Sequence, residues 1–466
     1  MKLKGLLIIL FSVMITLGLW LGSKWFYNDW FIDNYKYLSK TSSLTAIILF
    51  SWSMILSARF KTIENLFGGL DKVYTAHKWL GIFGFCLILL HPIFLALHNL
   101  PNTAKFVAYF GLYEFDSIQN AGFNFGIAAI ALLISLILMI QNNKIPYHIW
   151  KKSHEFMTLF YIVGVLHILL VTADISKYPL LAIWMYSWFI YATFCGIYIK
   201  FLYPIFGPCF EYTITQIEKY EDMIEIKLTP NSSKVLRHKP GQFAFVKFQS
   251  LGFDSQSHPY SIACAPNPEG TIMFGIKVLG DDTKNILSLE VGEKALIYGP
   301  YGNLGEKFLR GDKDCVCIGG GIGVTPFLSI WDAALNHENT NNGIKYSKVH
   351  LFYSVKSEAE AICDDNIRNS MIQSHISCDT DCILRGHSYT LYNVQRDGFL
   401  TIEKIQDKIG DLKNKYFLLC GPKVMTDSLI KQLKDKGVKN TQIVLENFDM
   451  RHVNLNWLFD IIGLNK

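Results

Sequence analysis

The chain has few charged residues before about residue 205, and it has no run of lysine and arginine interleaved with aromatic residues. Its formal net charge is only +5 over 466 residues. Nucleic-acid binding needs a basic patch, so no nucleic acid is expected as a partner. The chain also lacks internal repeats and low-complexity segments.

The N-terminal segment MKLKGLLIILFSVMITLGLWLG lacks a small-x-small cleavage site, although two lysines precede its apolar core. Further apolar segments follow it, so we interpret it as an uncleaved first membrane span and not as a signal peptide. The ten cysteines form no regular framework, and most fall in the second half of the chain. This distribution favours reduced cytosolic thiols over disulfides.

The first half of the chain is rich in apolar stretches. Half of all residues are hydrophobic, and the mean hydropathy is +0.23. About 20 apolar residues cross a bilayer core as a helix, and six stretches have about this length. They lie near residues 5–22, 42–58, 76–98, 121–141, 153–172 and 179–203. Lysine and arginine are more frequent on the N-terminal side, so the positive-inside rule predicts a cell-membrane protein with both termini cytoplasmic.

The second half of the chain has the pattern of a soluble protein. From about residue 208, short stretches alternate apolar and polar residues between turn signals such as KPGQ and APNPEG. This pattern predicts a small antiparallel barrel. After residue 312, strands alternate with helical segments, which predicts a parallel α/β sheet. The predicted domains are therefore a six-helix membrane bundle over 1–205, a barrel over 206–311 and an α/β domain over 312–466.

Four histidines lie inside two of the apolar stretches. His77 and His91 are 14 residues apart, and His154 and His167 are 13 apart. At ~1.5 Å per residue, the two histidines of one span lie about 20 Å apart along the helix axis. Each of two depths therefore holds one imidazole from each span. This predicts axial ligation of two haem irons, one by His77 with His154 and one by His91 with His167. The alternative is helix-contact histidines that bond backbone or hydroxyl groups.

The helical geometry supports the haem-ligand interpretation better for His77 and His91 than for His154 and His167. Fourteen residues at ~100° each return to within about 40° of the start, so His77 and His91 share one face. Thirteen residues give about 220°, so a helix irregularity or an offset crossing is expected between His154 and His167. For His98, near the membrane surface, an interfacial role is favoured over contact with a quinone or a metal.

Three segments of the second half have features of flavin and nucleotide sites. In SHPYSIACAP, the ring of Tyr260 suits a flavin face and the hydroxyl of Ser261 suits a ring nitrogen. CIGGGIGVTP departs from the G-x-G-x-x-G fingerprint, but it follows a strand and opens a helix, which suits a phosphate turn. The further candidates are Lys277 and Thr283 for a pyrophosphate, Gly319, Gly320, Gly321 and Gly323 in the turn, Thr325 and Pro326 opening the helix, and Cys420, Gly421 and Pro422 at the carboxyl edge of the sheet. Taken singly, each is also explained by packing or solvation.

Taken together, these residues resemble the ferric reductase / NADPH oxidase superfamily. The resemblance covers nearly the whole chain through the paired histidines, HPYSIA, GPYG, GGGIGVTP and CGP. It implies a transmembrane electron chain from NAD(P)H through FAD and two b-type haems to an acceptor on the far side of the membrane. In this scheme NAD(P)H docks on the glycine turn and Cys420. FAD contacts Tyr260 and Ser261 of the His258-Pro259-Tyr260-Ser261 motif, with His258, Lys277 and Thr283 near its phosphates.

Two segments depart from the family pattern or add to it. In VLENFDM, the resemblance implies that Phe448 stacks on the flavin, but 18 residues follow it, so its role stays open. Packing is favoured over a docking helix for the tail 449–466. Cys378 and Cys382 in CDTDC, near His375 and His387, are interpreted as structural residues, with a metal site or a redox pair as alternatives.

Four functions remain open at this point. The favoured one is an oxidase that reduces O₂ to superoxide, because the short outer loops lack an evident acidic cluster for iron. The others are a reductase of ferric iron or its chelates, a membrane electron donor to a partner protein, and a non-redox nucleotide sensor. No protein partner is required by the sequence. NADPH is favoured over NADH, because Ser354 and Lys356 follow a strand that has no acidic residue at its end.

Overall fold

The computed structural model describes residues 3–31, 33–100, 102, 107, 110–141, 145–171, 173–220, 222–250, 257–278, 285–337, 346–362, 367, 381–384 and 386–446. The chain divides into two compact units. The first, here called the helical unit, comprises the residues up to Phe206, and the second, the sheet unit, comprises Gly207–Phe448.

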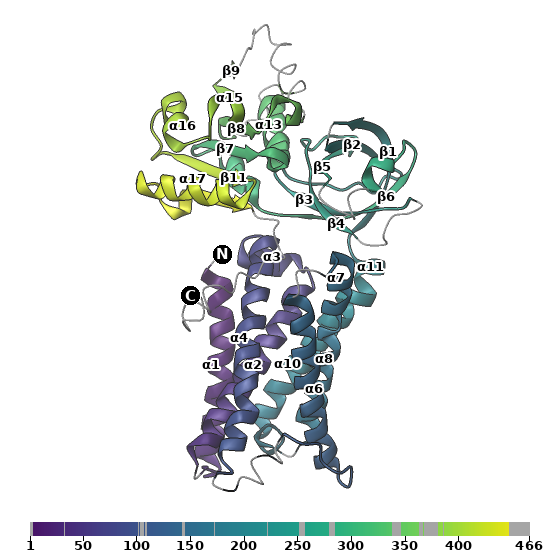
Figure 1. The fold of residues 1–466 in the computed structure, drawn as a ribbon, viewed down its shortest axis with the longest axis vertical. Coiled ribbons are helices and arrows are strands. Elements are labelled where there is room, and N and C mark those ends of the chain that lie inside the picture. Colours follow the sequence, from purple (N-terminus) through teal and green to yellow (C-terminus); the bar gives the residue numbers. More distant parts are fainter. Residues whose placement is uncertain are drawn as a thin grey trace. The chain divides into compact units, whose positions relative to one another are not determined.

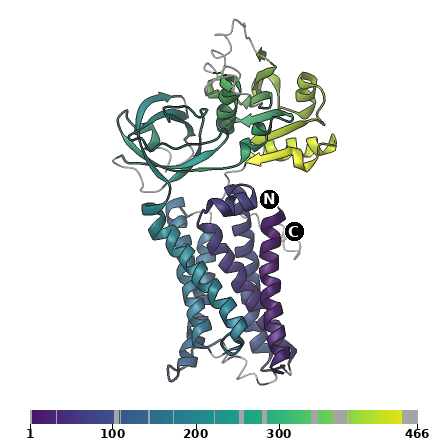
Figure 2. The same ribbon diagram turned by 180° about the vertical axis from the view of Figure 1, so that it is seen from behind.

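The helical unit is a bundle of long helices that run alongside one another (Figures 1 and 2). Among the described residues, five helical segments are long and apolar enough to cross a membrane, or six when α2 and α3, bent by 114° at their junction, count as one span. The helices are α1 (Leu3–Phe26), α2 (Asn34–Ser57), α3 (Lys61–Phe67), α4 (Leu70–Leu97), α6 (Ile118–Gln141), α7 (Tyr147–Glu155), α8 (Met157–Leu170), α9 (Asp174–Lys177), α10 (Pro179–Ile197) and α11 (Tyr203–Phe206), with a π-helical turn at Tyr198–Leu202 before α11.

Helix α2 lies at the centre of this bundle. Every residue from Ala46 to Leu56 is buried, and α2 packs against α1, α4 and α10. Large apolar side chains elsewhere, such as Phe11 and Leu180, are exposed on the outside of the bundle. In a bilayer these side chains face lipid, so hydrophobic residues occupy both the inside and the outside of the unit.

The span that contains His154 and His167 is interrupted between them. Helix α7 ends at Glu155 and α8 begins at Met157, with Phe156 between them. The sequence predicted either an irregularity here or an offset crossing, because 13 residues of an ideal helix place two side chains on different faces. The break at Phe156 lies between the two histidines, so it is such an irregularity.

The first part of the sheet unit is an antiparallel barrel. Its strands are β1 (Cys209–Lys219), β2 (Met223–Pro230), β3 (Phe243–Phe248), β4 (His258–Ser261), β5 (Ile272–Lys277) and β6 (Lys294–Tyr301), in the order β4-β3-β6-β1-β2-β5. A single bridge between Ile262 and Phe274 connects the two edge strands and nearly closes the barrel. Alternate inward side chains, including Ile214, Ile226 and Ile297, fill its interior.

The second part is a mostly parallel sheet with helices on both faces. Its strands are β7 (Asp314–Gly320), β8 (Val349–Val355), β9 (Asp381–Leu384), β10 (His387–Asn393), β11 (Lys415–Cys420) and β12 (Ile443–Glu446), in the order β12-β11-β7-β8-β10-β9, and β9 alone is antiparallel to its neighbour. Successive residues of β7 point to opposite faces. Cys315 and Cys317 pack towards α13 (Thr325–His337), and Val316 and Ile318 pack towards α16 (Ile402–Ile409) and α17 (Lys423–Asp435).

The helical segment predicted after β8 lies mostly outside the described residues. Of its described part, Glu358–Glu360 forms a short 3₁₀ turn and Ile367 is helical. Helix α13 also joins the two parts of the sheet unit, because the Ser329 hydroxyl donates to the carbonyl of Cys264 at 2.8 Å and Asp332 accepts from the amide of Ala265 at 2.8 Å.

Candidate electron-transfer sites

Three of the four intramembrane histidines have Nδ1 against a backbone carbonyl oxygen. The pairs are His77 with Ser53 at 2.9 Å, His91 with Ser39 at 3.2 Å and His167 with Gly122 at 2.8 Å. A carbonyl oxygen only accepts hydrogen bonds, so Nδ1 carries the proton in each case. In the neutral imidazole Nε2 then holds the free lone pair, and this is the form that ligates a metal.

His154 has a different environment. Its Nδ1 is buried and has no hydrogen-bond partner among the described residues. Its ring is stacked on Trp150, with ring centroids 5.6 Å apart and an interplanar angle of 5°. A buried polar atom without a partner is uncommon and typically marks a redox site, an ion or an ordered water.

The bundle brings together His77 and His154, the first predicted pair. Their ring centroids are 5.8 Å apart, at 68°. A metal–imidazole bond is about 2.0 Å long, so a ring-centroid distance of 5.8 Å leaves the first pair close enough to share one metal. Ligation itself stays a prediction.

Two glycines on the helices that carry these histidines have open space at their Cβ positions. A Cβ atom at Gly81 or at Gly164 would meet nothing within 4 Å. Gly81 follows His77 by four residues and Gly164 precedes His167 by three, so each shares a helix face with a histidine. The tautomers, the orphaned nitrogen and these open positions all fit haem groups held by the four histidines.

His98, outside these pairs, has a local partner. Its Nδ1 contacts the carboxylate of Asp33, which precedes α2. The contact links the end of α4 to the start of α2 and agrees with the interfacial role favoured from the sequence.

The predicted flavin motif forms strand β4 at the edge where the barrel closes. Ser261 lies opposite Phe243 on β3, and Tyr260 lies opposite Ala244. The half-buried ring of Tyr260 is 6.3 Å from Phe274 and 6.5 Å from His258. The motif, with Pro259 in its middle, therefore places a half-buried aromatic ring at the edge where the barrel closes.

Lys277 is already paired at the end of β5. Its Nζ lies 2.9 Å from Oδ2 of Asp222, which directly precedes β2, the antiparallel neighbour of β5. A pyrophosphate at this position has to share the ammonium group with that carboxylate, so a phosphate role for Lys277 stays a prediction. Thr283, the other predicted phosphate residue, lies outside the described residues, as do Phe448, Cys378 and the tail.

The glycines of the nucleotide turn fall into two groups. Three are required by packing, because a Cβ at Gly319 would lie 2.7 Å from the Cα of Val324, one at Gly320 would lie 2.9 Å from the ring carbon Cδ of Pro422, and one at Gly323 would lie 2.5 Å from the carbonyl oxygen of Cys420. Gly321 differs, because its φ is +52° and a Cβ there would meet nothing within 4 Å. Gly321 is therefore the turn residue where a ligand can approach the backbone.

Helix α13 begins directly after this turn, at Thr325, with Pro326 in its first turn as predicted. The Thr325 hydroxyl donates to the carbonyl of Ile322 at 2.9 Å. A helix N-terminus next to an open glycine turn has free amide groups and a partial positive charge, so it suits an anion such as a nucleotide phosphate.

Cys420 lies at the carboxyl edge of the sheet between two other candidate residues. It is in register with Gly319 on β7 and with Glu446 on β12. Burial, with the charge of Glu446 added, holds the pKa of the Cys420 thiol well above its usual range. The next residues, Gly421 and Pro422, lead into α17, and Gly421 has a φ of +148°.

Glu446 was not among the residues predicted from the sequence. It is 5% exposed, and its Oε1 lies 3.2 Å from where a Cβ of Gly302 would be, so it links the GPYG segment of the barrel to the nucleotide sheet. The signal for it was an acidic residue that ends an apolar strand two positions before Phe448.

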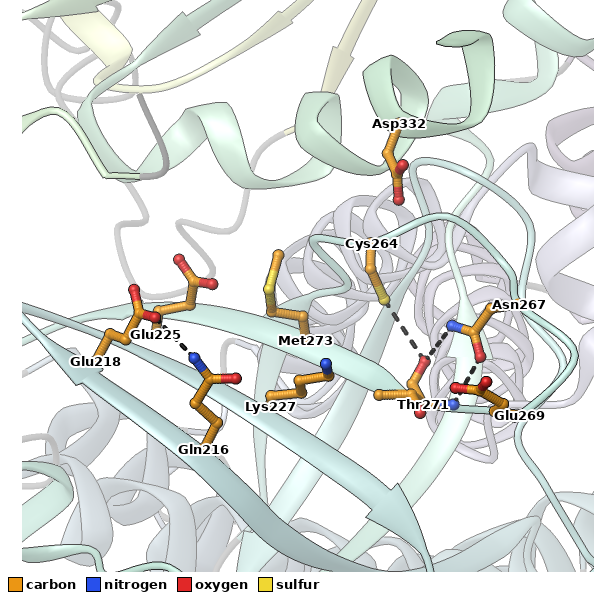
Figure 3. Close-up of a pocket in the computed structure, with 10 residues that line it drawn as sticks. All are labelled: Gln216, Glu218, Glu225, Lys227, Cys264, Asn267, Glu269, Thr271, Met273 and Asp332. Carbon is orange, nitrogen blue, oxygen red and sulfur yellow. Dashed lines mark hydrogen bonds between the residues drawn. The ribbon is translucent and has the colours of Figure 1, made fainter. Parts of the chain in front are cut away.

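A separate polar cavity of about 460 Å³ lies between the barrel and α13 (Figure 3). Its lining includes the carboxylates of Glu218, Glu225, Glu269 and Asp332, with Lys227 as its ammonium group. This acidic lining repels phosphate groups, and its residues differ from all of those predicted for FAD or nucleotide. His387, expected near a possible metal cluster, instead accepts a hydrogen bond from the amide of Val349 through its Nδ1.

Comparison with known families matches three successive parts of the chain. Residues 42–165 match the ferric reductase like transmembrane component, 205–305 match an FAD-binding domain, and 317–431 match an oxidoreductase NAD-binding domain. The chain has the single-chain architecture of the ferric reductase / NADPH oxidase superfamily. It is thus an integral membrane oxidoreductase with FAD-binding and NAD(P)H-binding domains, and the family predicted from the sequence is confirmed.

The relatives of this ferric-reductase-like chain are distant. The gamma subunit of sulfhydrogenase 2 from Pyrococcus furiosus is 26% identical over 248 residues, which cover 50% of this chain and 80% of that protein. One component of the Na(+)-translocating NADH-quinone reductase from Yersinia enterocolitica is 26% identical over 223 residues, or 44% of this chain, and the match spans about half of that component, 52%. A solved structure, the ferredoxin reductase in carbazole 1,9a-dioxygenase, is 22% identical with a TM-score of 0.39 and covers 52% of this chain and 69% of that chain.

Proposed function

We propose that this protein carries electrons from cytosolic NAD(P)H across the membrane to an acceptor on the far side, with O₂, reduced to superoxide, as the favoured acceptor. FAD bound on the barrel, and two b-type haems bound by His77 with His154 and His91 with His167, would supply hydride acceptance and one-electron carriage. The observation that carries this proposal is the set of carbonyl contacts that leave Nε2 of three paired histidines free to ligate a metal.

The sheet unit would bind and orient the reduced nucleotide. The open backbone at Gly321 and the N-terminus of α13 would hold its phosphates, and the carboxyl edge at Cys420 would receive its nicotinamide ring. Cys420 stays protonated near neutral pH because its pKa is raised, so it offers a neutral, polarizable surface and no competing nucleophile. We assign Glu446, beside Cys420, to the same site.

The barrel would hold the flavin between these residues and its own edge. The Tyr260 ring would lie against the flavin and the Ser261 hydroxyl would donate to a ring nitrogen, while His258 would lie near the phosphates. Phe448, which follows the described strand β12 by two residues, is proposed as the aromatic that covers the flavin until the nicotinamide arrives.

In the helical unit the residues act by fixing geometry. Three of the four histidines have Nε2 free, and the backbone carbonyls at Nδ1 prevent a change to the other tautomer. The two pairs, about 20 Å apart along α4, define two depths and so a route across the membrane. We propose that both termini and the sheet unit are cytoplasmic, as the distribution of positive charge indicates.

The test uses the purified full-length protein with NADPH and three conditions: O₂, a ferric chelate, or neither. Superoxide and Fe²⁺ are measured separately, together with the absorption spectrum of flavin and b-type haem. NADPH oxidation that depends on O₂ and yields superoxide supports the proposal, whereas Fe²⁺ formation alone replaces it with a ferric-chelate reductase. Electron transfer only in the presence of an added protein identifies a partner-dependent donor, and a preparation without haem or flavin bands overturns the electron-chain proposal.

A single variant tests the haem assignment. His91→Leu is expected to lose one of two haems while flavin reduction by NADPH continues, because His91 belongs to the pair that lies further from the N-terminal side of the bundle. His98→Gln is the matched control, since His98 is the next residue after α4 and contacts Asp33. Retention of both haems in His91→Leu contradicts the assignment.

A further inference from the structure

Helix α2 repeats one contact to α4 at an interval of 14 residues. Ser39 and Ser53 are 14 residues apart, and so are His77 and His91. Ser53 contacts His77 and Ser39 contacts His91, so α2 and α4 run antiparallel and in register at both depths. One serine–histidine contact between neighbouring helices is common. Here a serine hydroxyl contacts Nδ1 of a histidine at both depths, which indicates a shared role.

At the depth of His91, the hydrogen-bond contacts show which atom carries each proton. The Ser39 hydroxyl oxygen lies 2.7 Å from His91 Nδ1 and donates its proton to the His91 carbonyl at 3.1 Å. A hydroxyl has one proton, so towards the ring Ser39 Oγ is an acceptor. The N–H of Nδ1 is therefore shared between the hydroxyl oxygen and the carbonyl oxygen of Ser39, the latter at 3.2 Å.

The second depth repeats this arrangement. Ser53 Oγ lies 3.0 Å from His77 Nδ1 and its carbonyl oxygen lies 2.9 Å away. Both serines are buried, with Ser39 0% and Ser53 8% exposed. A serine inside a helix usually bonds a carbonyl of the preceding turn, as Ser43 does with Lys40 and Ser57 does with Met54. Ser39 and Ser53 differ from these two neighbours because their hydroxyls contact another helix.

We propose that Ser39 and Ser53 are positioning residues, each of which orients one axial histidine and tunes one haem. This inference rests on the proposed function, in which His91 and His77 ligate iron. An acceptor at Nδ1–H fixes the ring and makes Nε2 a stronger donor, which stabilises the ferric state and lowers the reduction potential. Because each serine meets one histidine, Ser39 acts on one haem and Ser53 acts on the other.

The experiment is a spectroelectrochemical titration of the purified full-length protein, with low-temperature EPR of its oxidised haems. Ser39→Ala and Ser53→Ala remove the hydroxyl acceptor and keep the backbone carbonyl. Each variant is expected to shift the midpoint potential of one haem to a more positive value and to change that haem's g values, and the two variants affect different haems. Ser39→Thr and Ser53→Thr keep a hydroxyl and are expected to restore the original values.

Ser43→Ala and Ser57→Ala are matched controls on the same helix, because their hydroxyls bond only α2 in the contacts described above. If an alanine variant does not accumulate, Ser39→Cys or Ser53→Cys replaces the oxygen by a weaker acceptor and is expected to shift the potential in the same direction. The inference is overturned if the serine variants match these controls or if both haems shift together in each variant. Failure of the proposed function looks different, since the unmodified protein then lacks two b-type haems.

Discussion

Removal of the Asp174 carboxylate is expected to destabilise the helical unit strongly. Lys24 of α1 is fully buried, and its Nζ lies 3.2 Å from Oδ1 of Asp174, whose side chain is 7% exposed. The other oxygen, Oδ2, accepts from the indole of Trp20 at 2.7 Å. Phe31 covers the ammonium group at 3.7 Å from its ring centroid. The carboxylate therefore compensates a buried charge and satisfies a buried donor at once.

The magnitude follows from these contacts. Removing one partner of a buried ion pair costs about 3–5 kcal/mol, and a buried donor left without its acceptor costs about 1–3 kcal/mol. Asp29 also lies 3.5 Å from Lys24, but its side chain is 42% exposed, so as a surface pair it returns at most about 1 kcal/mol. The net expectation for Asp174→Ala is about 3–8 kcal/mol. For a unit of about 200 residues this lowers the midpoint of thermal unfolding by at least about 6 °C.

The assay is thermal unfolding of the purified protein in detergent, followed by tryptophan fluorescence. Asp174→Asn keeps an acceptor for Trp20 and removes the charge, so it separates the two contributions. Asp29→Asn is the matched control and is expected to cost less than about 1 kcal/mol. The double variant Lys24→Met with Asp174→Leu should recover most of the loss, because no uncompensated charge remains. The reasoning is refuted if Asp174→Asn unfolds within about 1 °C of Asp29→Asn.

Three further predictions concern the sheet unit. Gly323→Ala places a Cβ against the Cys420 carbonyl, so it should cost about 1–3 kcal/mol and raise the KM for NADPH, and an unchanged unfolding midpoint contradicts this. Burial, with the charge of Lys415 added, lowers the pKa of His350 to about 4, below its ordinary 6.5. The folded state therefore favours the neutral ring, so the stability that the buried neutral ring contributes is present above pH 6.5 and is lost as the pH falls towards 4. His350→Gln should flatten this part of a stability-against-pH curve, and an unaltered slope contradicts it. Lys356→Glu should lower kcat/KM for NADPH relative to NADH by about 10- to 100-fold, since a charge-assisted contact of about 1.5–3 kcal/mol to the 2′-phosphate is lost, and an unchanged ratio argues against a 2′-phosphate at this position.

The order of elements could be predicted because it depends on local pattern. Apolar runs of spanning length, alternating strands and a glycine turn before a helix are all properties of short segments, and the predicted glycine turn lies between β7 and α13. The helical segment predicted after β8 lies mostly outside the described residues, so it stays a prediction.

The candidate sites were predicted in part for the same reason. Spacing along the chain predicted that His77 and His91 share a helix face. It predicted an irregularity or an offset crossing between His154 and His167, without giving the position of the break at Phe156. Glu446 was missed, because its nearness to Cys420 and Gly302 arises from sheet register and from packing against the barrel. The pairing of Lys277 with Asp222 was missed too, since it joins strands that are far apart in the sequence.

The sequence alone determined the classes of domain, their order and the residue types that can hold haem, flavin and nucleotide. These follow from hydrophobic periodicity and short motifs, which need no knowledge of distant contacts. Only the tertiary structure decided which ring nitrogen is free in His77, His91 and His167, because the answer depends on carbonyl and hydroxyl groups of α2 and α6. It also separated Gly321 from the glycines that packing requires, since the space around a backbone atom is set by the elements that fold against it.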